Sequence, residues 1–276
     1  MTYEGLVLDL DEHLYHADPA LSASGMKQLL KTPAHFAHYR QNPQKPRAEF
    51  DVGTAAHSKV LGVGAPIAVI PDSMLASNGY ASTGAAKEFI AKARAEGKVP
   101  LKSDVAAEVD AMAESVLAHP KALALLEQDG HAEASLFATD PDDHIAMRCR
   151  FDKLAAKCAD VKTTAGTADV DGFENSIEKY GYDVQAAHYR RVLRLVTGED
   201  RPFLFIVVEK EPPYLVGVHI LHAEFMEMGE AKAREARRRF REGITSGEWP
   251  GYGDDIFVAR PKPWHVAKFQ ERYANV

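Results

Sequence analysis

The sequence is poor in cysteine and in long apolar runs, and both absences exclude classes of protein. Its 276 residues include two cysteines, Cys149 and Cys158, without a C-x-x-C pair. This content excludes a zinc ribbon and a four-cysteine iron–sulfur cluster and indicates a reducing compartment. No stretch approaches the roughly 20 apolar residues of a membrane span, and the acidic N-terminus does not resemble a signal peptide. We therefore predict a cytoplasmic protein without membrane contact.

An excess of basic charge is also absent. Lysine and arginine number 33 against 40 aspartates and glutamates, which gives a net charge of −7. Binding to nucleic acid through overall charge is therefore excluded, and it would need a local basic groove or bound cations. With 46% hydrophobic and 26% charged residues, the composition is that of an ordinary globular protein.

The first half of the chain is predicted to be mostly helical. Cap-type serines and helical spacing of apolar residues favour helices over 22–41, with an interruption at Pro33, over 51–62, and over 82–127 with a break near 97–100. A short strand is expected at 65–71. The length allows two domains, but we predict one domain over 1–276, in which 1–128 is a helical part and 129–276 carries a sheet.

The second half changes character at Gly130, where short alternating segments replace the helical patterns. Strands are predicted at 131–140, 145–155, 158–164, 202–210 and 214–221. Helices are predicted at 170–196 and 223–243, followed by an irregular, aromatic-rich tail. Trp249 and Trp264 are expected to anchor this tail on the core.

Two predicted strands carry acids and a lysine that suit metal-assisted chemistry. Because side chains alternate along a strand, Asp160 and Lys162 project to one side while Val161 points into the core. If the strands pair through the tight turn between them, Asp152 lies near Asp160. Carboxylate and carbonyl oxygens suit Mg²⁺ or Mn²⁺, and a lysine can orient or deprotonate a water. Of the three acid-x-Lys triplets in the chain, only this one lies on a strand preceded by a second aspartate strand.

Several strings occur in an order that resembles a known family. R-x-R-x-D at 148–152 precedes D-x-K-T-T at 160–164 and G-Y-x-x-Q-A-A-x-Y at 181–189. The order resembles the PD-(D/E)xK nucleases, and among them the RecE-like (exonuclease VIII type) prophage exodeoxyribonucleases and the related RecB-type nuclease domains. The strings LSASGMKQLLKTPAHF, DVGTAAHSKVL, EASLF, WPGY and KPW resemble further elements of that group. The likeness covers roughly residues 15 to 265.

The resemblance implies an α/β fold, in which a small mixed sheet is flanked by helices and joined to a helical N-terminal part. It implies a Mg²⁺ site, with Mn²⁺ as a substitute, formed by His57, Glu133, Asp152, Asp160 and the carbonyl of Val161. Lys162 would be the catalytic lysine beside Asp152 and Asp160. Gln185 and Tyr189, four residues apart on one helix face, would assist them. The hairpin between the two aspartates is shorter than is common in the family, which leaves its register open.

The implied activity is a Mg²⁺-dependent exodeoxyribonuclease that digests double-stranded DNA from its 5′ ends and leaves 3′ single-stranded tails for recombination. Family analogy adds a ring-shaped homo-oligomer and a single-strand annealing protein as partners. The alternatives are an endonuclease or a nuclease of other polarity with this fold, and a non-catalytic DNA-binding protein. Predicted contacts to DNA phosphates come from five arginines near the catalytic strands and the Q-x-x-x-Y helix, namely Arg148, Arg150, Arg190, Arg191 and Arg194.

Overall fold

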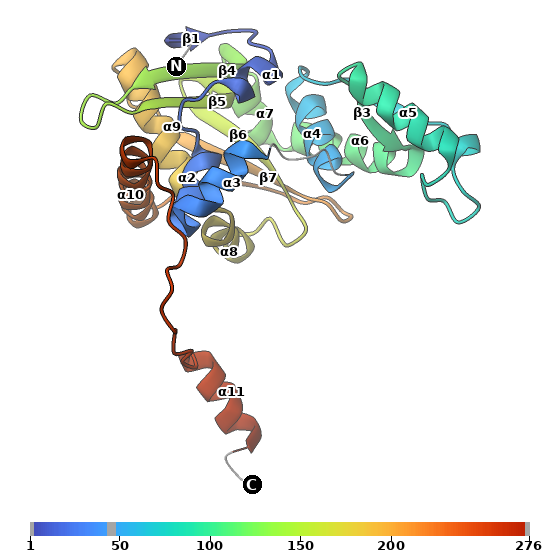
Figure 1. The fold of residues 1–276 in the computed structure, drawn as a ribbon. Helices are drawn as coiled ribbons and strands as arrows, with labels where there is room; N and C mark the ends of the chain where they lie inside the picture. Colours follow the sequence, from blue (N-terminus) through green and yellow to red (C-terminus); the bar gives the residue numbers. More distant parts are fainter. Residues whose placement is uncertain (1–2, 43–47, 274–276) are drawn as a thin grey trace.

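A mixed six-stranded sheet organises the structure, a computed structural model that describes residues 3–42 and 48–273. The strands lie in the order β1 (Gly5–Val7), β4 (Gly130–Thr139), β5 (Ala146–Ala155), β6 (Cys158–Thr164), β7 (Phe203–Glu209) and β8 (Val216–Ile220). Neighbours pair antiparallel except β6 and β7, which are parallel. This arrangement confirms the predicted mixed α/β fold (Figure 1).

The sheet is covered on both faces, which explains the apolar run of its inner strand β7. Phe203, Phe205 and Val207 belong to one core cluster, whereas Ile206 and Val208 belong to a second cluster on the opposite face. A strand buried on both faces needs apolar residues at successive positions instead of alternate ones.

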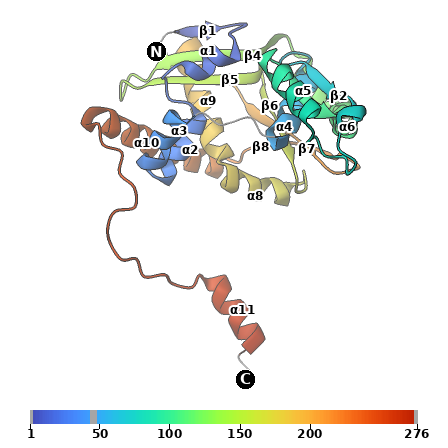
Figure 2. The same cartoon turned by 45° about the vertical axis from the view of Figure 1, so that its right-hand side comes forward.

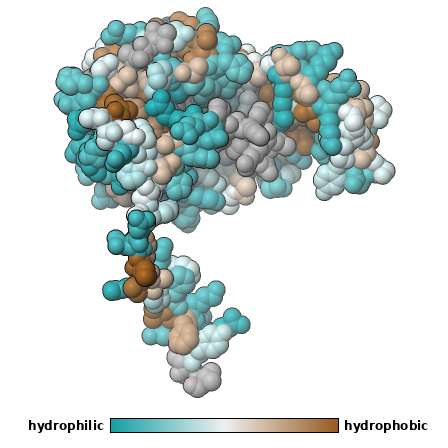
Figure 3. Space-filling model, in the orientation of Figure 1, coloured by the Kyte–Doolittle hydropathy of each residue, from teal (hydrophilic) through white to brown (hydrophobic). Residues whose placement is uncertain are grey.

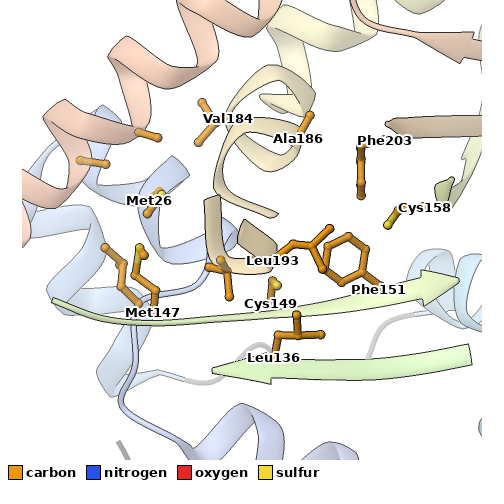
Figure 4. Close-up of a cluster of buried hydrophobic side chains, with 14 of the residues drawn as sticks. Met26, Leu136, Met147, Cys149, Phe151, Cys158, Val184, Ala186, Leu193 and Phe203 are labelled. Atoms are coloured by element: carbon orange, nitrogen blue, oxygen red, sulfur yellow. The ribbon is translucent and has the colours of Figure 1, made fainter. Parts of the chain in front are cut away.

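Two groups of helices supply these two layers (Figures 1 and 2). On one face lie α2 (Ala23–Lys31), α9 (Tyr182–Thr197) and α10 (Ala223–Ser246). On the other face lie α4 (Ala48–Leu61), α6 (Ser103–Ala118) and α7 (Pro120–Leu126). Figure 4 shows the first cluster, where Met26 of α2 and Leu193 of α9 lie among Met147, Cys149 and Phe151 of β5. The catalytic strands predicted from the sequence are therefore held between two helical layers.

The other elements extend this framework. They are α1 (Glu12–Ala17), α3 (Pro33–Gln41), β2 (Ile67–Ile70), a 3-10 turn (Asp72–Met74), α5 (Gly84–Ala95), β3 (Val99–Lys102), α8 (Val170–Tyr180) and α11 (Pro263–Tyr273). Among the described residues, no helix is both long and apolar enough to cross a bilayer.

Three elements differ from the predictions. The break expected near 97–100 contains strand β3, which pairs in parallel with β2. The single helix expected over 170–196 is two helices, because Gly181 adopts a φ of 64°, a left-handed conformation that glycine adopts without a steric penalty. The tail expected to be irregular contains α11, which projects away from the sheet and its helices (Figures 1 and 3).

The two tryptophans of the tail have different environments. The Trp249 ring centroid lies 5.2 Å from that of Phe36 and 6.2 Å from that of Phe240, so Trp249 anchors the start of the tail as predicted. Trp264 is 59% exposed, and its predicted anchoring role is wrong. The reason is that Trp264 lies on α11, whose residues are all exposed and which projects away from the sheet and its helices (Figure 1).

His188 in α9 is fully buried and gives the fold a predicted sensitivity to acid. Its Nε2 lies 2.9 Å from the carbonyl oxygen of Arg148, and burial lowers its pKa to about 4. The folded protein thus holds a neutral imidazole, whereas the unfolded chain takes up a proton below its usual pKa of about 6.5. We expect the contribution of His188 to the free energy of unfolding to be fully present above pH 6.5. About 3 kcal/mol of it should be lost as the pH falls to 4. Urea denaturation of the wild type and of His188→Gln at pH 7 and pH 4.5 measures this loss of unfolding free energy in each protein. Equal losses in both proteins would contradict the prediction.

Candidate active site

The hairpin of β5 and β6 brings two buried aspartates to the same level of the sheet. Lys153 pairs with Ala159 in antiparallel register, so Asp152 lies level with Asp160. Their exposed fractions are 8% and 2%. Buried carboxylates are costly unless they are paired and hydrogen-bonded, and each aspartate has such partners.

Asp152 belongs to a cluster with His57 of α4 and Glu133 of β4. His57 Nε2 lies 2.7 Å from Asp152 Oδ2, and His57 Nδ1 lies 3.2 Å from Glu133 Oε1. The backbone N–H of Val161 donates to the same Asp152 oxygen at 2.6 Å. One potential ligand atom from each of the three side chains lies within 4.8 Å of the others. A helix and two strands far apart in sequence thus converge on one point.

Electrostatics hold a positive charge at the centre of this cluster. Burial disfavours an imidazolium, but the carboxylates of Asp152 and Glu133 outweigh it and raise the pKa of His57 to about 9. Burial opposes ionisation of Asp152 too, yet the His57 charge holds the pKa of Asp152 below its usual range. Burial raises the pKa of Glu133. Imidazole nitrogen and carboxylate oxygens are a donor set that fits a divalent cation, which would replace the histidine proton.

Glu133 reaches this cluster through an unusual backbone conformation. Its φ is 50°, in the left-handed region that costs a non-glycine residue roughly 1–2 kcal/mol. The residues on either side of it, Ala132 and Ala134, pair regularly with β5. Strain confined to one residue inside a regular strand is typical of functional sites. Here it occurs at the residue whose carboxylate contacts His57.

Asp160 belongs to a second, adjacent cluster. Gln185 of α9 donates from Nε2 to Asp160 Oδ1 at 2.7 Å, and Lys162 Nζ forms an ion pair with Asp160 Oδ2. Burial and the neighbouring charge of Asp152 raise the pKa of Asp160 to about 6, against the effect of Lys162. Burial would lower the pKa of Lys162, but the two carboxylates outweigh it and raise that pKa. The lysine is therefore a charged ammonium inside the site.

The predicted ligand set is thus divided between two neighbouring clusters. His57, Glu133 and Asp152 lie together, whereas Asp160 contacts Lys162 and Gln185. The side chain of Val161 is buried in the core and its N–H bonds to Asp152, so Val161 connects the clusters through its backbone. A role for Asp160 and the Val161 carbonyl as metal ligands stays a prediction.

The two residues of the Q-x-x-x-Y pair have different surroundings. Gln185 is buried and bonded to Asp160. The ring of Tyr189 packs against Phe151 and Phe203, with centroid distances of 5.1 and 5.5 Å. Burial raises the pKa of its hydroxyl well above the usual value. Gln185 thus contacts a candidate catalytic group, whereas the described contacts of Tyr189 are with the aromatic core.

Arg148 and Arg150 make contacts within the protein, and their contact with DNA stays a prediction. Arg148 is 8% exposed, and its guanidinium donates to the backbone carbonyls of Tyr15, His16 and Ala20. Arg150 donates to Ser135 Oγ and the carbonyl of Leu10, and its guanidinium lies 3.8 Å from the carboxylate of Glu133. The carbonyls that these arginines bind belong to the N-terminal segment, which therefore lies against β5.

The arginines in the second half of α9 form ion pairs with aspartates that lie outside the two candidate catalytic clusters. Arg190 and Arg194 bind Asp200, and Arg191 binds Asp140 and Asp142. Arg194 follows Gln185 by nine residues, or roughly two and a half helical turns, which puts it on the opposite face of α9. The structure does not bring these arginines to the acid clusters, and their contact with DNA stays a prediction.

Two residues beside the site were not predicted. The ammonium groups of Lys27 and Lys162 lie 5.5 and 5.4 Å from the ring centroid of Tyr182. Lys27 belongs to the string LSASGMK and Tyr182 to the string GYDVQ. Their proximity depends on the packing of α2 against α9, which the strings do not reveal.

Comparisons with known proteins agree with this architecture. Residues 22–261 match the family model described as "PDDEXK-like domain of unknown function (DUF3799)". A crystal structure of a "Putative exonuclease" from Eubacterium rectale superposes with a TM-score of 0.61 at 12% sequence identity, covering 98% of this chain and 100% of that chain. That likeness shows a shared fold. Among curated proteins, none matches the chain. Since the family model spans most of the sequence, the chain belongs to the PDDEXK-like family DUF3799.

Proposed function

We propose that this protein is a metal-dependent deoxyribonuclease, and specifically a Mg²⁺-dependent exonuclease that digests duplex DNA from 5′ ends and leaves 3′ single-stranded tails. The observation that supports hydrolysis most directly is the adjacency of the two clusters. A histidine held between two carboxylates lies beside an aspartate paired with a buried lysine. The fold of the family is consistent with this activity.

The side chains have separable tasks in this proposal. His57, Glu133 and Asp152 would hold the cation, with Asp160 as the further predicted ligand. When bound, a divalent ion supplies charge neutralisation at the phosphate and lowers the pKa of a coordinated water. Lys162 directs its ammonium toward the attacking water or a phosphate oxygen, and Gln185 fixes the orientation of Asp160.

The finer parts of the proposal come from the resemblance and stay predictions. They are the 5′ polarity, the role in recombination, the ring-shaped homo-oligomer and the single-strand annealing partner. The cytoplasmic location is supported by two buried free cysteines, which fit a reducing compartment.

A digestion assay tests both the coarse and the fine proposal. Linear and covalently closed circular duplexes are incubated with Mg²⁺, Mn²⁺ or EDTA, and the linear duplex is labelled at either the 5′ or the 3′ end. We expect degradation of the linear form alone, no degradation with EDTA because the carboxylates then have no cation, and early release of the 5′ label. Cleavage of the circle would instead indicate an endonuclease. DNA binding without cleavage in any of these metals would indicate the non-catalytic alternative.

A further inference from the structure

Lys27 reaches the candidate active site from a helix that carries none of the acids. It lies on α2, is half-buried, and holds its ammonium 5.5 Å from the ring centroid of Tyr182. The ammonium of Lys162 lies 5.4 Å from the same centroid. Tyr182 begins α9, three residues before the glutamine that binds Asp160. Lys27 and Tyr182 thus form a basic and aromatic edge beside the second cluster.

The local sequence explains how Lys27 gets there. Ser22 caps α2 by accepting the N–H of Gly25 at 3.2 Å, which fixes where the helix begins. The aliphatic stem of Lys27 then lies across Gly181, where an added Cβ would be 3.3 Å from both its Cγ and its Cε. The junction between α8 and α9 therefore leaves room for this lysine because it lacks a side chain.

The charge of Lys27 is not matched by an anion. Lys162 has Asp160 as its ion-pair partner, whereas Lys27 forms no ion pair or hydrogen bond to protein within the described residues. Burial and the nearby ammonium of Lys162 lower the pKa of Lys27 to about 8, against the weaker effects of the Asp160 and Asp183 carboxylates, neither of which forms an ion pair with it. A half-buried cation that contacts an aromatic ring but has no anionic partner is incompletely compensated. Such a group is satisfied when a ligand brings the anion.

We propose that Lys27 and Tyr182 form a phosphate-binding subsite, in which the Lys27 ammonium binds a phosphate oxygen of the DNA strand next to the phosphodiester that Lys162 faces. This inference rests on the proposed function. The phosphate has two possible sources, the terminal 5′-phosphate monoester or an internal phosphodiester. An ammonium binds either one as a point charge, while Tyr182 limits the access of water to it.

The test measures binding of DNA to Lys27→Met, because methionine keeps an aliphatic stem over Gly181 and removes the charge. Duplexes labelled at the 3′ end, with a 5′-phosphate or a 5′-hydroxyl, are titrated by fluorescence anisotropy in Ca²⁺. We expect Kd to rise about 10-fold, the low end for a charged hydrogen bond, and Lys27→Arg to restore most of the affinity. A loss confined to the 5′-phosphorylated duplex identifies the terminal phosphate, and an equal loss on both identifies an internal one.

Lys31→Met is the matched control, since Lys31 is an exposed lysine at the end of the same helix. It should leave Kd unchanged. With Mg²⁺, Lys27→Met should raise KM by a similar factor and leave kcat within about twofold, the signature of an interaction made equally in the ground and transition states.

The failures of the two proposals can be told apart. Wild-type protein that binds DNA but does not cleave it in Mg²⁺ or Mn²⁺ overturns the nuclease and leaves the subsite supported by the change in Kd. An unchanged Kd for Lys27→Met on both duplexes overturns the subsite whether or not the wild type cleaves. A lower melting temperature of Lys27→Met with unchanged Kd would give Lys27 a purely structural role and would also overturn the subsite. A wild type that binds neither duplex would overturn the subsite too.

Discussion

Lys162→Met is expected to lower kcat/KM for linear duplex DNA by about 100-fold or more in Mg²⁺. Lys162 presents a charged ammonium that is paired with Asp160 and lies next to the His57 cluster. Methionine has a similar length and shape but cannot donate a hydrogen bond to the attacking water or the phosphate. Positioned proton donors and acceptors contribute roughly 10²- to 10⁴-fold to rate. Initial rates of release of labelled nucleotide measure the effect.

Loss of activity in Lys162→Met indicates a catalytic role for the lysine only if the variant is folded. Breaking a buried ion pair by removing one partner can cost about 3–5 kcal/mol. The cost should be smaller here, because the pKa of Asp160 is already about 6 and its carboxyl can take up a proton while Gln185 keeps its bond. Lys157→Met, in the exposed turn between β5 and β6, is the control and should be as active as the wild type. A folded Lys162→Met protein with more than about a hundredth of wild-type activity would rule out a catalytic role for the lysine.

The order of elements around the acids was predictable because it depends on local signals. Alternation and a turn predicted β5 and β6 as adjacent strands, with the register left open. Alternation along β6 put Asp160 and Lys162 on the same side, where they form an ion pair. Gly181 is a signal that could have divided the predicted helix at 170–196, since glycine followed by a new amphipathic run is typical of a helix end.

The contacts that depend on packing could not be read from local pattern. Nothing near His57 in sequence shows that both of its nitrogens contact carboxylates from the sheet. The alternation along β5 predicts an exposed position for Arg148, but in the fold the N-terminal segment covers it and accepts its hydrogen bonds. Lys27 looks like a solvent-facing residue of an amphipathic helix, and its position beside Tyr182 arises only when α2 packs on α9. Long-range packing, not propensity, decides these three cases.

His57→Gln is expected to weaken binding of Mn²⁺ by about 100-fold and to lower cleavage by a similar factor. The imidazole lies between Asp152 and Glu133, so its nitrogen is one of three donors that converge on one point. Glutamine is of similar size and can donate a hydrogen bond to Asp152, but an amide is a poorer ligand than imidazole for a first-row metal. Titration calorimetry with Mn²⁺ in the absence of DNA measures affinity independently of activity.

His131→Gln is the matched control for this experiment. His131 lies on β4 two residues before Glu133, is exposed and is not part of the cluster, so the exchange is the same at a histidine outside it. It should leave both affinity and cleavage unchanged. If His57→Gln binds Mn²⁺ as tightly as the wild type yet cleaves slowly, His57 is not a ligand. Its contacts with Asp152 and Glu133 would then serve to orient the two carboxylates, and Asp160 would be the remaining candidate to complete the metal site with them. Loss of both binding and cleavage in His57→Gln, with neither lost in His131→Gln, would place the metal at the point where α4 meets the sheet.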